Sequence, residues 1–123
     1  MQRPLSPHLS VYKPQLTSVL SILHRFTGVA LFVAAFFLVT CIACVAHGPA
    51  AYEVLFYFLN TWVGRLGIGG LFFAFYYHFF NGLRHLYWDI GQGYDLSVTY
   101  RTGWLVMSVT ALATLITIWH FFL

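Results

Sequence analysis

A histidine lies deep within a long apolar segment of this 123-residue chain. The segment runs from about Gly64 to Tyr87, and His78 lies in its interior, some ten residues from the end that Asp89 marks. Ionisable side chains in such apolar segments are rare and mark candidate functional sites. A neutral imidazole placed there requires a metal ion or a hydrogen-bond partner. His78 is therefore the first candidate for chemistry.

Small residues precede and follow His78 at helical spacing. Gly70, Ala74, His78 and Gly82 are four residues apart, so a helix would place them in one stripe. Such a stripe lets either a flat group or a second helix approach closely. One interpretation is purely structural: the small residues pack against a second helix, and His78 forms a hydrogen bond to that helix.

A second histidine strengthens the alternative of a bound flat cofactor. His85 follows His78 by two helical turns, about 10 Å along the same face, with Arg84 next to it. An axial imidazole, small residues beside a macrocycle and cations near its propionates would suit haem. Covalent haem c is excluded, because the Cys-Ile-Ala-Cys sequence at 41–44 is followed by Val45 instead of histidine. A non-covalent b-type haem remains.

The second candidate cluster is Ser21, His24 and Arg25, at the start of an earlier apolar segment. Ser21 and Arg25 share a helix face, with His24 beside them. A hydroxyl, a fixed cation and a titratable imidazole suit a quinone, whose oxygens gain negative charge on reduction and are then protonated. The structural alternative is a helix-capping serine with an arginine that reaches toward lipid phosphates.

The elements that must position these residues follow from the composition. Only 7% of residues are charged and 60% are hydrophobic, which excludes a water-soluble globular fold. Long segments with few charges predict three transmembrane helices, at about 19–46, 64–87 and 103–122. The aromatic-rich linker between the first two spans predicts an interfacial belt or a short helix lying flat on the membrane. We therefore expect an all-α integral membrane protein.

The remaining features constrain sidedness and exclude other classes. The proline-rich stretch 1–18 predicts an extended tail without a secretory signal, and its unprocessed Met1 fits a bacterial inner membrane or an organelle-encoded chain. Scattered basic residues exclude a nucleic-acid site, and two cysteines cannot hold an iron–sulfur cluster. The positive-inside rule places the N-terminus in the cytoplasm or matrix, because Arg65 alone lies on the opposite side. The basic residues on the first side are Arg3, Lys13, Arg25, Arg84 and Arg101.

Three stretches together resemble a known family. RPLSPHLSVYKPQ, SILHRFTG and YHFFNGLRHLYWDIG, in this order, resemble the cytochrome b subunit of succinate dehydrogenase, the large membrane anchor of succinate:quinone oxidoreductase. The resemblance covers the whole chain and its motif positions show no departure. The ordered combination is specific, whereas two histidines seven residues apart in an apolar helix would be a weak signal alone.

The resemblance implies a role for each candidate residue. His78 would be an axial ligand of haem b, and a histidine of a second membrane-anchor subunit would fill the other axial position. His24, Arg25 and His85 would line the haem propionate edge. Ser21 and Arg25 would contribute to a ubiquinone pocket that other subunits complete.

The same resemblance implies an organisation for the complex. Residues 1–123 would form a single membrane-anchor domain within a helical bundle shared with the second anchor. Flavin and iron–sulfur clusters would belong to two soluble subunits docked on the inner face, so this chain would not be an enzyme by itself. Two other interpretations stay open: the anchor of a menaquinol:fumarate reductase, and a cofactor-free structural tether. A solute carrier is disfavoured, because no charged residue lies between Arg65 and His78.

Overall fold

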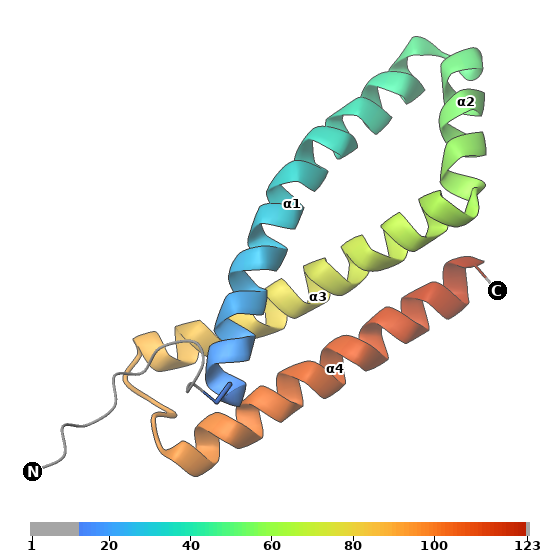
Figure 1. The fold of residues 1–123 in the computed structure, drawn as a ribbon. Coiled ribbons are helices and arrows are strands. Elements are labelled where there is room, and N and C mark those ends of the chain that lie inside the picture. The colour runs from blue at the N-terminus through green and yellow to red at the C-terminus, as the bar shows by residue number, and fades with distance from the viewer. Residues whose placement is uncertain (1–12, 123) are drawn as a thin grey trace, which may run out of the picture.

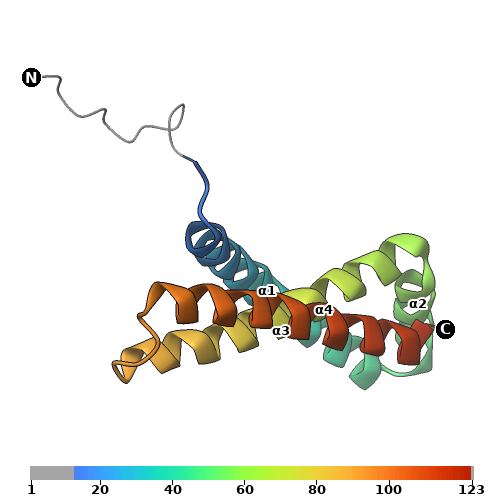
Figure 2. The ribbon, with the colours of Figure 1, turned by 90° about the horizontal axis from the view of Figure 1, so that it is seen from below.

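A computed structural model describes residues 13–122, and all regular structure in this range is helical. The helices are α1 (Leu16–His47), α2 (Pro49–Asn60), α3 (Trp62–Asp89) and α4 (Leu96–Phe122). Helices α1 and α3 cross near the start of α1 and diverge from there, while α2 joins their far ends (Figure 1). Helix α4 packs on α3, as both views show (Figures 1 and 2). The predicted all-α fold is confirmed.

Within residues 13–122, two or three helices could span a membrane. Helices α1 and α4 are each long and apolar enough to do so, and α2 and α3 meet the same criterion only as a pair bent by 80°. The predicted core segments 19–46 and 64–87 lie within α1 and α3. The short helix predicted as one option for the linker is present as α2.

Residues at the helix junctions explain the breaks in the chain. Gly48 has a φ of 107°, a conformation that favours glycine, and Pro49 follows at the first position of α2. Thr61 ends α2 and caps α3, because its hydroxyl accepts a hydrogen bond from the Gly64 amide at 3.1 Å. At these two single-residue junctions the helix axis changes direction, so α1, α2 and α3 follow one another closely in sequence but point in different directions.

Two helices begin before the segments predicted from the sequence. Most of the predicted tail, residues 1–12, lies outside the described residues, but residues 16–18 already belong to α1. The third predicted span begins at Gly103, whereas α4 begins at Leu96. The first turn of α4 forms early because the Thr99 amide donates to the Asp95 carbonyl at 2.8 Å.

The buried core is small and lies where α1, α3 and α4 meet. Leu20 and Tyr77 are 1% and 0% exposed, and Val106 of α4 packs against them. The Tyr77 hydroxyl donates to the Leu20 carbonyl at 2.7 Å and so fixes α1 on α3. Large apolar side chains such as Phe26 and Phe32 face outward. Polar contacts inside and apolar side chains outside are typical of helices packed within a membrane.

Candidate functional site

Three imidazole rings form one column where α1 crosses α3. The His24 ring of α1 stacks on His78 with centroids 4.0 Å apart and planes 7° apart. Its other neighbour is His85, at 4.8 Å and 19°. The shared face predicted for His78 and His85 is thus confirmed, and His24 lies between them. The described residues contain no group of three or more His, Cys, Asp or Glu side chains that could hold a metal ion together.

The His78 ring is held through one of its two nitrogen atoms. Nδ1 lies 3.1 Å from the His24 carbonyl oxygen and 3.3 Å from the Thr27 hydroxyl. A carbonyl only accepts hydrogen bonds, so Nδ1 carries the ring proton and Nε2 keeps its lone pair. Within residues 13–122 no hydrogen bond reaches Nε2. An imidazole fixed through Nδ1–H to a carbonyl, with Nε2 available, has the arrangement of a metal-ligating histidine.

Glycines permit this close packing of rings and helices. A β-carbon on Gly28 of α1 would lie 3.0 Å from His78 Cε1, and one on Gly82 would lie 3.9 Å from His24 Cε1. Ala74 is buried, but Gly70 has open space around it. The predicted small-residue stripe therefore contacts a neighbouring helix over part of its length, and Gly70 lies outside that contact.

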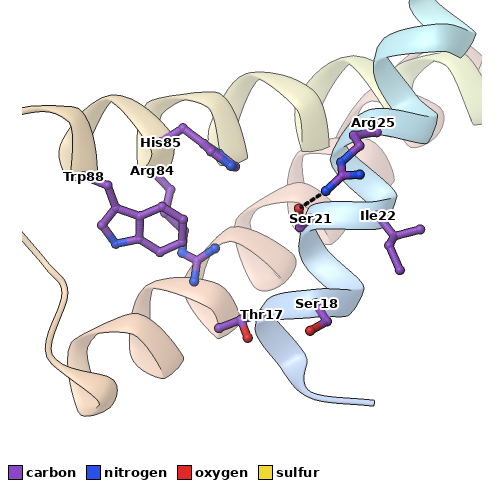
Figure 3. A pocket seen from close by; sticks show the side chains of 8 residues that line it. All are labelled: Thr17, Ser18, Ser21, Ile22, Arg25, Arg84, His85 and Trp88. Carbon is purple, nitrogen blue, oxygen red and sulfur yellow. Dashed lines mark hydrogen bonds between the residues drawn. The ribbon is translucent and has the colours of Figure 1, made fainter. Parts of the chain in front are cut away.

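An open pocket of about 560 Å³ lies beside the histidine column, between the start of α1 and the end of α3 (Figure 3). The Arg25 guanidinium lies 3.4 Å from the Ser21 hydroxyl, in hydrogen-bond contact across one helical turn. The predicted shared helix face of Ser21 and Arg25 is confirmed, and His85 reaches the same pocket. Its lining residues are Thr17, Ser18, Ser21, Ile22, Arg25, Arg84, His85 and Trp88.

Arg84 has a different environment from the one its position suggested. It was expected as a cation at the polar boundary, but it is only 5% exposed. Its guanidinium donates to the Thr99 carbonyl at 3.0 Å and to the Thr102 hydroxyl at 3.1 Å, and it lies 4.1 Å above the Trp88 ring. Arg84 thus joins α3 to the first turns of α4, and Arg25 is the more accessible cation of the pocket.

Two features of the site escaped the sequence interpretation. Thr27 contacts His78 from the other helix, and although it lies within the SILHRFTG stretch, no role was inferred for its hydroxyl. The second is the stripe of Tyr77, Asn81 and Arg84, which are all buried. Their spacing of four and three residues puts them on one helix face, so this polar stripe in an apolar helix could have revealed the surface that packs on α1 and α4.

The fold and the histidine site together define a helical membrane protein with a candidate cofactor or metal ligand at a helix crossing. Comparison with known families gives a specific assignment: residues 1–118 match the succinate dehydrogenase/fumarate reductase transmembrane subunit family. The chain therefore belongs to this family and is a membrane subunit of such a complex. The resemblance inferred from its three motifs is confirmed.

Individual relatives agree along nearly the whole chain. The succinate dehydrogenase cytochrome b556 subunit of Rickettsia felis is 40% identical, covering 94% of this chain and 90% of the relative. The cytochrome b560 subunit of Reclinomonas americana is also 40% identical, over 94% of this chain and 84% of its own. The cytochrome b556 subunit of Paracoccus denitrificans is 30% identical, with 98% and 92% covered.

Proposed function

We propose that this chain binds haem b through His78 Nε2 and contributes Ser21 and Arg25 to the quinone site of a succinate:ubiquinone oxidoreductase. The observation that carries the haem assignment is the tethering of His78. Its Nδ1–H is directed to a carbonyl of α1, and Nε2 has no hydrogen-bond partner within the described residues. Bound haem supplies reversible one-electron chemistry.

The surrounding residues fit such a group. His24 Nδ1 is buried without a hydrogen-bond partner among the described residues, which is costly unless a ligand supplies one. Arg25 and His85 lie on the adjacent pocket and would hold anionic propionates. The relatives are named as b-type cytochromes, which agrees with this donor set. A second anchor subunit would supply the other axial histidine.

The quinone assignment depends on the contact between Ser21 and Arg25. Their polar atoms lie together at the wall of a pocket whose volume of about 560 Å³ suits a small ring system. The guanidinium remains charged, so it stabilises the negative charge that develops on a quinone oxygen. His85 on the same pocket is a candidate for moving a proton to that oxygen. The family also includes fumarate reductase subunits, whose reaction runs in the opposite direction.

The proposed placement has the pocket on the inner side of the membrane. The start of α1 and the end of α3 flank it, and these are the ends where the positive-inside rule places the cytoplasm or matrix. A flavoprotein subunit and an iron–sulfur subunit would dock on this face and deliver electrons to the quinone. The membrane would be a bacterial inner membrane or a mitochondrial inner membrane.

The haem assignment is tested by spectroscopy of the purified complex. Reduction by dithionite should give a b-type haem band in the wild type, and His78→Leu should abolish or shift it. His120→Leu is the matched control, because His120 lies near the far end of α4. An unchanged band in His78→Leu would exclude His78 as ligand, and a wild-type complex without haem would favour the cofactor-free tether.

The quinone assignment is tested by comparing two electron acceptors. Ser21→Ala and Arg25→Leu should lower quinone reduction by succinate while electron transfer to a soluble dye stays close to wild type. Ser108→Ala and Arg101→Leu remove the same groups from exposed positions of α4 and should leave both activities unchanged. Equal loss of both activities in the pocket variants would indicate an assembly defect and contradict the assignment.

A further inference from the structure

Among the threonines of residues 13–122, Thr27 is the one whose hydroxyl lies within hydrogen-bond distance of a histidine ring. Thr40, on the same helix, bonds to the Phe36 carbonyl at 3.0 Å, as helical threonines commonly do. The Thr27 hydroxyl lies 2.9 Å from the carbonyls of Leu23 and His24, and also 3.3 Å from His78 Nδ1 on α3. Thr27 is 3% exposed, so this contact is sealed from solvent and lipid.

The direction of each hydrogen bond follows from the number of protons. A hydroxyl has one proton to donate, and the two backbone carbonyls can only accept. The Thr27 proton therefore goes to the carbonyl of Leu23 or His24, and its oxygen lone pair faces His78 Nδ1. The Nδ1–H of His78 is then shared between two acceptors of α1, the Thr27 oxygen and the His24 carbonyl.

We propose that Thr27 is a positioning residue for His78: its hydroxyl holds the imidazole in the Nδ1–H form and directs Nε2 toward the haem iron. The proposal rests on the proposed haem ligation and assigns Thr27 no contact with the haem. Partners of this kind fix the ring orientation and raise the basicity of the ligating nitrogen.

Two measurable consequences follow when the hydroxyl is removed. The imidazole keeps one acceptor instead of two, so its orientation loosens and haem affinity should fall about 10-fold to 100-fold, the usual range for loss of such a partner, which is detected as faster haem release. The less polarised Nδ1–H also makes Nε2 a weaker donor to ferric iron. The reduction potential of the haem should therefore become more positive.

The experiment uses the complete membrane complex with Thr27→Val, which replaces the hydroxyl by a methyl group of similar size. Thr27→Ser keeps the hydroxyl and should have the wild-type rate of haem release and the wild-type reduction potential. Haem release is measured as transfer to apomyoglobin, and the potential is measured by redox titration. Thr40→Val removes the corresponding backbone bond elsewhere on α1 and is the matched control. Thr27→Ala is the companion variant, because it deletes the hydroxyl without a branched replacement.

The outcomes separate this inference from the proposed function. Faster release and a more positive potential in Thr27→Val and Thr27→Ala, with Thr27→Ser and Thr40→Val like the wild type, support the proposal. Wild-type values in the first two variants, or equal changes in Thr40→Val, overturn it. Failure of both hydroxyl deletions to accumulate also overturns it, since the hydroxyl would then serve packing. If His78→Leu leaves the haem band unchanged, the ligand assignment itself fails.

Discussion

Gly28 is the position where a single methyl group most directly tests the geometry of the site. In Gly28→Ala the new β-carbon would lie 3.0 Å from His78 Cε1 and 3.5 Å from Nδ1. Favourable carbon–carbon contacts lie at about 3.5–4.0 Å, so the imidazole must shift. That ring is stacked on His24 and hydrogen-bonded to its carbonyl, and a shift weakens both contacts.

The size of the effect follows from two opposing terms. Overpacking a tight contact costs about 1–3 kcal/mol. Alanine is favoured over glycine within a helix by about 1 kcal/mol, which offsets part of that cost in the stability of the chain. The offset does not apply to the proposed haem binding, because a displaced His78 Nε2 would no longer lie where the proposed ligand must be. At about 1.4 kcal/mol per tenfold change, we expect haem retention to fall about fivefold to a hundredfold.

The assay is haem content and haem release in the purified complex, with thermal stability in detergent measured beside them. Gly67→Ala is the matched control, because a β-carbon there meets no atom within 4 Å and brings the same helix preference. The expected result is weaker haem retention in Gly28→Ala and no change in Gly67→Ala. Gly67→Ala should be about 1 kcal/mol more stable than the wild type, and Gly28→Ala should lie between no change and a loss of about 2 kcal/mol. Identical haem retention in the two variants would refute the reasoning from the helix crossing.

Two further predictions concern the contacts that fix the helices. Arg84→Leu removes the hydrogen bonds to Thr99 and Thr102 and should lower the free energy of unfolding in detergent by at least about 2 kcal/mol. The exposed control Arg101→Leu should change it by less than about 0.5 kcal/mol. Equal effects would contradict the role of Arg84 in joining α3 to α4. Tyr77→Phe deletes the hydrogen bond to the Leu20 carbonyl and should lower the free energy of unfolding by about 1 kcal/mol. Tyr57→Phe, at a side chain that is 78% exposed, should cause no measurable change. An unchanged stability in Tyr77→Phe would show that the α1–α3 contact does not depend on this bond.

Composition and short-range spacing were sufficient for most of the fold. Long apolar segments require helices within a membrane, and Gly48 followed by Pro49 marks a break on local grounds. The start of α4 could not be read in this way, because its first turn is polar. That turn is stabilised by Arg84, which lies 15 residues earlier than its partner Thr99. Local polarity favours a loop there, and a tertiary contact makes it a helix.

The candidate site was predictable within each helix but not between helices. Spacing alone puts His78 and His85 on one face, and Ser21 beside Arg25. The stacking of His24 on His78 depends on the rotation of α1 against α3, which is set by Gly28 and by the Tyr77 hydroxyl. Nothing in the spacing within either helix encodes that rotation, so Thr27 could not be connected to His78 from the sequence.

The divergence of α1 and α3 has a mechanical consequence. Helices α1 and α3 are in contact near the histidine column and diverge toward α2 (Figure 1). When two stiff rods rotate about a contact, displacement grows with distance from that contact and is smallest at the contact itself. Helix α2 joins the far ends, so such a rotation would have to bend the chain at Gly48 and Thr61, whereas the imidazoles at the crossing would hardly move. A redox centre held at that point would be insulated from changes in membrane thickness.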